Sequence, residues 1–349
     1  MRSGLFFMAV FFLLAAPPQN AAGQDAQQKT SFKDRIPKDI LNSRPRFLTF
    51  TLENDLFGSG RDENYTNGVR IGYFDTGTRP SFPVDLLDKY LPTFEANETT
   101  SMYYSIGQNL YTPEDITKPA PDPDDRPYAG FLYGSAGFTS ITNNHIDEAE
   151  ATVGIVGPAA LGKPTQNFVH DLVNTRDPSG WDAQLDNEPA LMVSWQRRWP
   201  EAYYADLAGL HFRTSPHIGA TVGNVYTYAA SGVSLQITPE QYKWQSQPLR
   251  VRPAIPGSGF FSVPDNQFAW SLFSGFEGRA VARNIFLDGN TFSDSPSVDK
   301  KHFVMDANAG LSLTYGRYQV SYTLNWRSKE FHGQDNSSLF GAMSFGYRF

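Results

Sequence analysis

The chain has 349 residues, no cysteine and a net charge of -7, and its mean hydropathy is -0.40. This length suits one large β domain, and the negative charge makes nucleic acid an unexpected partner. A helical membrane protein needs apolar runs of roughly 18 or more residues, and none follows the first 23 residues. Aromatic residues make up 14% of the chain and glycine is abundant, a composition that favours an all-β fold.

Residues 1–23 are predicted to form a signal peptide. Arg2 precedes an apolar stretch that is too short to span a membrane, and small residues follow before the expected cleavage point. Residues 24–44 are polar and contain proline, which predicts a loose N-terminal lead-in. The remaining domain, residues 45–349, is therefore expected to be exported to the cell envelope.

The first predicted structural unit is a hairpin of two strands over residues 46–75. Apolar and polar residues alternate in both strands, so one face of each is apolar and the other polar. Asn54, Asp55 and Thr66 lie near the same end of this hairpin. If the polar faces line the inside of a barrel, a cluster of oxygen atoms lies at its rim.

Similar alternation predicts ten further strands. They cover residues 102–111, 128–139, 148–157, 191–199, 206–223 with a kink at Pro216, 226–237, 268–284, 302–315, 318–327 and 339–349. The total is about twelve, and single-chain bacterial outer-membrane barrels have an even number of strands. The last strand carries alternating aromatic residues to the C-terminus. The sequence thus predicts a transmembrane antiparallel up-and-down β-barrel, with a soluble β-sandwich or barrel as the alternative.

Two helices are expected between the strands. Residues 164–173 begin with Pro164, which suits a first helical position, and contain no further helix breaker. Residues 83–91 predict a second, shorter helix, whereas the Pro-, Gly- and Gln-rich residues 238–266 receive no assignment. If both termini are periplasmic, the connections that follow odd-numbered strands face the cell exterior, and helix 164–173 is extracellular.

Gln166 and His170 are the first candidates for catalysis. They are four residues apart, so they share one face of the predicted helix. A histidine held there could act as a general base in the hydrolysis of an ester. A surface or packing role for His170 is the alternative. The sequence has no G-x-S-x-G motif, no cysteine nucleophile and no His-x-x-x-His pair.

Asp55 and Thr66 are candidate metal ligands. Ca²⁺ prefers carboxylate, amide, hydroxyl and carbonyl oxygens, and Asp55, Thr66 and nearby backbone oxygens could supply part of such a set. The alternative is a strand that simply ends in turn-forming residues. In the motif DDRPYAG, Arg126 could pair with a substrate phosphate or with one of the two preceding aspartates.

Five ordered blocks carry a resemblance to a known family. They are LENDLFGSGRDENYTNGVRIGY, YSIGQNLYTPEDI, DDRPYAGFLYGSAGF, GIVGPAALGKPTQNFVH and GWDAQLDNEP. Together they resemble the lipid A 3'-O-deacylase family of outer-membrane enzymes. The resemblance is dense over the first half of the mature chain and rests on the strand pattern in the second half.

This resemblance implies a twelve-stranded barrel with a calcium-dependent site near the outer leaflet, where the 3'-linked acyloxyacyl chain of lipid A is hydrolysed. It implies that Asn54 and Asp55 correspond to the family's Asn-Asp pair and Thr66 to its hydroxyl residue. Gln166 and His170 correspond to its Gln and His on the extracellular helix. His170 would then deprotonate a water molecule, while Ca²⁺ held by Asp55, with help from Asn54 and Thr66, polarises the ester carbonyl.

The chain departs from the family pattern at two points. An acidic residue is expected shortly after the histidine, but position 176 is Arg. A basic residue expected before the Asp-Arg pair also lacks a clear match, so Lys118 or Arg126 is predicted to contact the substrate phosphate. Two other functions stay open from the sequence: a non-enzymatic porin or structural barrel, and an outer-membrane phospholipase.

Overall fold

Strands dominate the computed structural model, which describes residues 31–36, 42–58, 64–77, 94–120, 122–174, 177–242, 244–245, 251 and 259–349. The predicted signal peptide (1–23) and the predicted helix at 83–91 lie outside these residues. The strands are β1 (Arg46–Asn54), β2 (Asn64–Asp75), β3 (Ser101–Thr112), β4 (Ala129–Ile141), β5 (Ile146–Val156), β6 (Glu188–Arg198), β7 (Tyr203–Leu207), β8 (Leu210–Gly223), β9 (Tyr226–Pro239), β10 (Phe268–Asn284), β11 (Phe303–Tyr315), β12 (Tyr318–Arg327) and β13 (Ser338–Arg348).

The helices of the described residues are short. They are α1 (Phe32–Arg35), η1 (Asp55–Phe57), η2 (Pro158–Ala160), α4 (Gly162–Val173), η3 (Trp181–Ala183), η4 (Glu240–Tyr242) and α5 (Ile285–Asp288). The prediction of a helix at 164–173 is confirmed, with its start two residues earlier. In the part of the chain that the structure describes, no helix has the length and apolar character needed to cross a membrane.

The strands pair antiparallel in chain order, and the sheet closes into a barrel through two contacts between distant parts of the chain. β1 pairs with β13, and β6 pairs with β8. β7 pairs with the other half of β8, so β6 and β7 act as one strand that is interrupted between them. Counting that pair once gives a closed barrel of twelve strands, as the sequence predicts.

One predicted strand is wrong in its course. Residues 206–223 do not form a single kinked strand, because a turn at Ala208 and Gly209 separates β7 from β8, and both turn residues have positive φ angles of 53° and 75°. Pro216 lies within β8, where it pairs with Val233 and its carbonyl accepts a hydrogen bond from the backbone of Trp199. Its missing N–H therefore does not break the strand.

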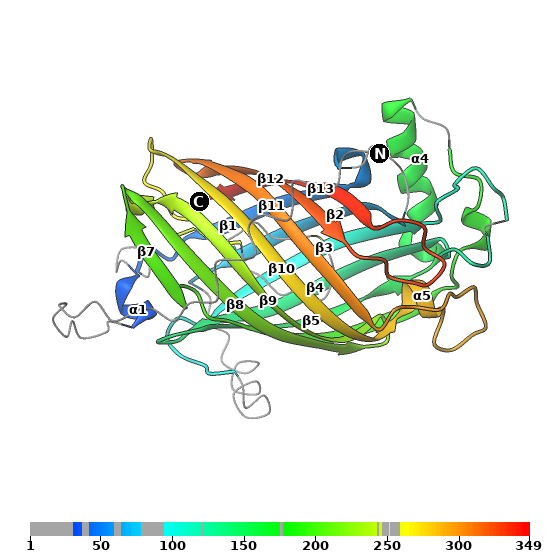
Figure 1. The fold of residues 1–349 in the computed structure, drawn as a ribbon, viewed down its shortest axis with the longest axis horizontal. Helices are drawn as coiled ribbons and strands as arrows, with labels where there is room; N and C mark the ends of the chain where they lie inside the picture. Colours follow the sequence, from blue (N-terminus) through cyan, green and yellow to red (C-terminus); the bar gives the residue numbers. More distant parts are fainter. Residues whose placement is uncertain are drawn as a thin grey trace. The chain divides into compact units, whose positions relative to one another are not determined.

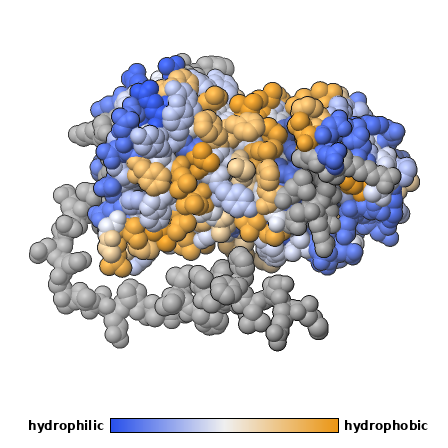
Figure 2. Space-filling view, turned by 90° about the horizontal axis from the view of Figure 1, so that it is seen from above, coloured by the Kyte–Doolittle hydropathy of each residue, from blue (hydrophilic) through white to orange (hydrophobic). Residues whose placement is uncertain are grey.

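Alternation along the strands separates an outer from an inner face. On β1, Leu48 and Phe50 are exposed, whereas Phe47, Thr51 and Glu53 are buried. Even-numbered residues of β1 therefore point out of the barrel and odd-numbered residues point into the lumen. Figure 2 shows the hydrophobic residues gathered over the middle of the barrel, with hydrophilic residues towards its two ends. This is the pattern of a barrel that crosses a membrane.

The lumen is filled at the end of the barrel that carries α4, called the α4 end below (Figure 1). The buried α5 places Phe286 against Tyr111, with ring centroids 4.0 Å apart, and Tyr111 shares a hydrogen bond of 2.9 Å with Tyr226. Deeper in the lumen, Arg70 pairs with Glu150 at 3.1 Å. Side chains from strands that are not neighbours in the sheet thus meet inside the barrel.

The unassigned residues 238–266 also enter the lumen where the structure describes them. Val251 is buried, its N–H donates to Glu53 Oε1 at 3.0 Å, and its carbonyl accepts a hydrogen bond from Tyr133 at 2.9 Å. Trp244 packs against Phe32 of α1. The lead-in at residues 24–44, which was predicted to be loose, therefore contains the short helix α1, and Phe32 of this helix is buried.

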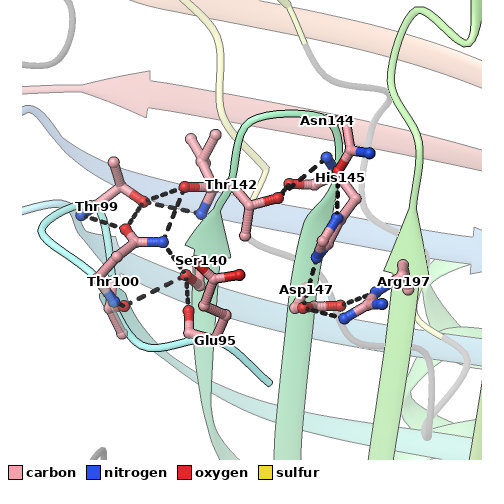
Figure 3. A network of polar contacts seen from close by, with 11 residues as sticks. Glu95, Thr99, Thr100, Ser140, Thr142, Asn144, His145, Asp147 and Arg197 are labelled. Carbon is pink, nitrogen blue, oxygen red and sulfur yellow. Dashed lines mark hydrogen bonds and ion pairs between the residues drawn. The ribbon is translucent and has the colours of Figure 1, made fainter. Parts of the chain in front are cut away.

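The opposite end is tied together by polar contacts around the turn between β4 and β5 (Figure 3). Ser140 of β4 binds the connection between β2 and β3: its hydroxyl donates a hydrogen bond to the carbonyl of Glu95 at 2.5 Å. Across the turn, Asp147 accepts from Arg197 at 2.8 Å and lies 3.2 Å from His145. This histidine lies at the opposite end from α4, so it takes no part in the site described next.

Candidate active site

Helix α4 begins on the outer wall of the barrel. Phe131 and Tyr133 of β4 are buried in the lumen, so the neighbouring Gly130 points outward. A Cβ at Gly130 would lie 3.2 Å from both Ala160 Cβ and Gly162 N. A side chain at this position would make contacts tighter than most Cβ atoms have, so glycine favours this close approach. The connection after β5 therefore folds back over the outside of β4 before it becomes α4.

The face of α4 that is buried carries polar residues. Gly162, Gln166 and His170 are spaced four residues apart and form its buried stripe; Gln166 is 2% exposed and His170 is 4% exposed. Phe168 and Leu172, by contrast, are 63% and 70% exposed. This arrangement reverses that of an ordinary surface helix, which buries its apolar residues. The predicted shared face of Gln166 and His170 is present in the structure.

Trp181 of η3 fixes the side chain of Gln166. Its indole Nε1–H donates to Gln166 Oε1 at 2.7 Å, and the ring is completely buried between Tyr128 and Gly162. Since Oε1 accepts this bond, the amide NH₂ of Gln166 is directed away from the indole. Sequence reasoning missed Trp181, because only the fold brings this loop residue against the helix.

Asn54 and Asp55 lie where β1 ends at the α4 end of the barrel. Asn54 pairs with Gly341 of β13 and with Asn67 of β2. Its position is outward-facing, yet both Asn54 and Asn67 are buried, and Asp55 is only 2% exposed. The two buried amides thus lie together on the outer wall, where lipid-facing strands normally expose their side chains, and the buried Asp55 follows directly in the chain.

The turn that holds Asp55 is seated on β13. Its Phe57 lies over Gly341, where an added Cβ would be 2.6 Å from Phe57 Cβ. The hydroxyl of Tyr322 donates to the carbonyl of Phe57 at 2.7 Å. Gly341 therefore leaves the space that this turn needs in order to lie against the outer wall.

The alternation used to predict an oxygen cluster at the rim does not extend to Asp55 or Thr66 in the structure. β1 ends at Asn54, so the alternation that was extended to Asp55 no longer applies in η1. The register of β2 shifts between Tyr65 and Asn67, so alternation counted from Arg70 does not reach Thr66. The backbone of Thr66 belongs to β2, and its side chain lies outside the described residues.

A row of paired residues connects Asp55 to α4 across the outer wall. Asn54 pairs with Asn67, Asn67 with Leu110, and Leu110 with Gly130, beside which α4 begins. Three strand spacings amount to ~14 Å, and the rise from Gly162 to His170 along the helix is ~12 Å. Asp55 and His170 therefore belong to the same end and the same outer surface of the barrel, within the dimensions of one lipid molecule.

The oxygen-rich donor set around Asp55 fits a hard divalent cation. In the described part of the chain, no three His, Cys, Asp or Glu side chains cluster as metal ligands. The side chains present are one buried carboxylate and the amides of Asn54 and Asn67. Calcium accepts such neutral oxygens together with backbone carbonyls and water, whereas zinc would need His or Cys ligands.

The two residues predicted to contact phosphate have different surroundings. Lys118 is half-exposed, forms an ion pair with Asp115 at 3.5 Å, and its carbonyl lies beside Gly180, next to Trp181. Arg126 is buried and pairs with Glu330 at 2.9 Å. Phosphate contact stays a prediction for both, and Arg126 would have to leave its ion pair to make it.

Glu330 belongs to a buried charge cluster above the lumen. Burial raises the pKa of its carboxyl, but the guanidinium groups of Arg327, Arg126 and Arg279 together outweigh burial and lower the pKa below its usual value. Arg327 in turn pairs with Asp306 at 2.8 Å. The carboxylate is therefore held ionised, and it fixes Arg126 at the start of β4.

Comparison with known proteins identifies relatives of the chain. The family model described as "Outer membrane protein LpxR" matches residues 5–349. Among solved structures, LpxR from Salmonella typhimurium is similar with a TM-score of 0.71 and 19% sequence identity, covering 86% of this chain and 99% of that one. No match was found among curated proteins.

Other solved barrels resemble the chain only weakly. The β domain of the Bordetella autotransporter BrkA has a TM-score of 0.40 at 8% identity and covers 87% of this chain and 98% of its own. The translocator domain of NalP from Neisseria meningitidis has a TM-score of 0.37 at 12% identity, with 89% and 91% covered.

Proposed function

The chain belongs to the LpxR family of outer-membrane lipid A 3'-O-deacylases, and we propose that it hydrolyses the 3'-linked acyloxyacyl ester of lipid A by attack of a water molecule that His170 activates. The supporting observation is that two buried polar groups, Gln166 with His170 and Asn54 with Asp55, occupy the outer wall at one end of the barrel. A lipid ester can reach this surface from the membrane without entering the lumen.

His170 is the proposed general base. It is buried on the stripe of α4 that faces the barrel, so its imidazole is shielded from bulk water. A base in such a position removes a proton from water as the oxygen attacks the ester carbonyl, and then returns a proton to the leaving alkoxide. Water supplies the hydroxyl group of the released acid, so no covalent acyl-enzyme is required.

Gln166 is proposed to act as a hydrogen-bond donor. Trp181 engages its Oε1, so the NH₂ group points away from the indole, and His170 lies one helical turn further along the same buried stripe. There it could donate to the imidazole or to a substrate oxygen. Lys118, half-exposed beside the Trp181 loop, is the better placed of the two basic residues for a lipid phosphate.

Asp55, with Asn54 and Thr66, is proposed to hold Ca²⁺. Bound there, the cation would polarise the ester carbonyl and stabilise negative charge on its oxygen. The protein's own contribution is to keep a carboxylate and two amides buried at a lipid-facing position, by seating the turn after β1 on Gly341. We also propose that the α4 end faces the cell exterior, where lipid A is located.

The alternatives from the sequence are less well supported. A porin needs a water-filled lumen, whereas α5 and Val251 are buried inside this barrel. A phospholipase would hydrolyse an ester by the same chemistry, so the two functions differ only in their lipid substrate. Family membership favours lipid A.

Mass spectrometry of lipid A from cells that express the protein tests the proposal. We expect the wild-type protein to remove the 3' acyloxyacyl group and His170→Ala to lose at least about a hundredfold in rate, the range for a general base. His332→Ala is the matched control, because this exposed histidine lies in another connection of the α4 end. Unchanged lipid A with the wild-type protein, or normal activity in His170→Ala, would refute the assignment.

A further inference from the structure

We propose that α4 is an interfacial helix whose exposed apolar flank, formed by Leu161, Phe168 and Leu172, lies in the hydrocarbon of the surrounding leaflet. All three side chains are exposed in the structure. The proposed function is needed for two parts of this inference: that the leaflet is the outer one, and that the lipid passing the helix is lipid A. The placement of the helix itself does not depend on it. That placement follows from how three kinds of residue are distributed around α4.

The side chains of α4 divide the helix into three sides. At ~100° per residue, the buried stripe of Gly162, Gln166 and His170 spans one side. The apolar flank lies on a second side, because Phe168 and Leu172 are four residues apart and point in similar directions. A soluble helix would place such residues against the protein. Here that side is occupied by polar residues, so the apolar flank needs another apolar environment.

The third side is polar and faces away from the apolar flank. Lys163 reaches Asp182 at 2.8 Å, and both side chains are well exposed. Asp171 and Asn174 are exposed as well. The charged flank and the apolar flank of α4 thus lie on either side of its buried stripe. A helix with this arrangement is suited to a membrane interface, with its axis near the membrane plane.

Helix α4 begins close to the hydrophobic band of the barrel. α4 begins beside Gly130, which pairs with Leu110 of β3, and the next strongly exposed apolar residue on that strand is Ile106. Four residues of strand span ~14 Å, or ~10 Å along the barrel axis at a usual tilt. A helix with side chains is ~10–12 Å wide, so its surface lies ~5–6 Å from its axis and comes within about one side-chain length of the band.

This placement gives the helix a function beyond carrying His170. Partition of Phe168 and Leu172 into hydrocarbon would hold the buried stripe at a fixed depth, near the level at which acyl chains join their head group. An ester would then enter between the barrel wall and α4 from the side. Its acyl chains would pass the apolar flank, and its sugar and phosphate groups would stay with the polar flank.

The absence of native cysteine makes a direct test straightforward. Single cysteines are introduced at Phe168 and Leu172 on the apolar flank and at Lys163 and Asp171 on the polar flank, and a nitroxide is attached to each. The full-length protein is reconstituted in vesicles of phosphatidylethanolamine and phosphatidylglycerol. Paramagnetic relaxation by oxygen, which concentrates in hydrocarbon, is compared with relaxation by a water-soluble nickel chelate.

We expect oxygen to dominate at Phe168→Cys and Leu172→Cys and the chelate to dominate at Lys163→Cys and Asp171→Cys. Asp171 and Leu172 are adjacent and both exposed in the structure, so a difference between them reports the membrane and not local mobility. Chelate access at all four positions would overturn the inference. The depth measurement needs no hydrolysis, so it stands even if lipid A is not the substrate.

A kinetic measurement follows from the same placement. Replacing Phe168 and Leu172 together by serine should slow hydrolysis of lipid A in vesicles more than hydrolysis of lipid A in detergent micelles. Equal slowing in both would overturn the inference, whereas absence of hydrolysis by the wild-type protein would contradict only the proposed function.

Discussion

The indole N–H of Trp181 donates a 2.7 Å hydrogen bond to Oε1 of Gln166, fifteen residues away in the sequence. The ring that makes this bond has no exposed surface, so the orientation of the Gln166 amide is set before any substrate arrives. In the proposed mechanism this amide must donate, which makes Trp181 a positioning residue.

Trp181→Phe is therefore expected to lower kcat by about threefold to tenfold, the value of one lost hydrogen bond. The loss should disappear in a Gln166→Ala background, because the bond then has no acceptor. Trp326→Phe is the control, since its indole also donates a hydrogen bond, to Ser337 at 2.9 Å. A loss that persists in the Gln166→Ala background would mean that Trp181 acts only through stability.

Removal of calcium is expected to abolish activity and to lower thermal stability in detergent. Chelation with EDTA should do both, and added Ca²⁺ should restore both, because a ligand that binds only the folded protein stabilises it. Asp55→Asn should weaken the response to Ca²⁺ in both measurements. If calcium leaves the melting temperature and activity of the wild-type protein unchanged, Asp55 does not hold a functional cation.

Gly341→Ala is predicted to weaken calcium binding without preventing barrel assembly. The added Cβ would lie 2.6 Å from Phe57 Cβ, so the turn that carries Asp55 must shift. Gly134→Ala is the matched control, because the nearest atom to its added Cβ would be 3.8 Å away. The calcium concentration for half-maximal activity should rise in Gly341→Ala alone, and equal values for the two variants would contradict the prediction.

Glu330 predicts a dependence of stability on pH. Folding lowers its pKa, so its contribution is present above the pKa of the unfolded chain and is lost as the pH falls towards the folded value. The melting temperature in detergent should fall as the pH drops below about 5, the region in which an ordinary glutamate protonates.

Glu330→Gln should be less stable at neutral pH by about 3–5 kcal/mol, the cost of leaving a buried partner such as Arg126 unpaired, and its stability should vary less with pH in the acid range. Asp335→Asn, at an exposed position of the same connection, should behave like the wild type. A Glu330→Gln variant with the wild-type pH profile would show that another group controls acid stability.

Most strands could be predicted from the sequence because each has one face in lipid and one in the lumen, and this contrast produces alternation. Alternation failed where the backbone departs from regular pairing: the turn at Ala208 and Gly209, the end of β1 before Asp55, and the shifted register beside Thr66. The inner or outer position of the oxygen cluster depends on two of these irregularities, so it could not be predicted.

The candidate site was predicted in part. Helical spacing placed Gln166 and His170 on one face, but which face would be buried depends on the barrel wall beside Gly130. Contacts between distant residues, such as the ion pair of Arg126 with Glu330, are separated by 204 positions and leave no local pattern in the sequence. The family resemblance supplied residue roles that composition and spacing alone left open.

The side chains inside the barrel affect whether its lumen can act as a channel across the membrane. Phe286 and its neighbours occupy the lumen at one end, and Val251 is buried among the strands below them. A wide barrel with an open lumen forms a water-filled channel. The side chains at this end narrow that channel, and the proposed chemistry on the outer wall does not depend on it.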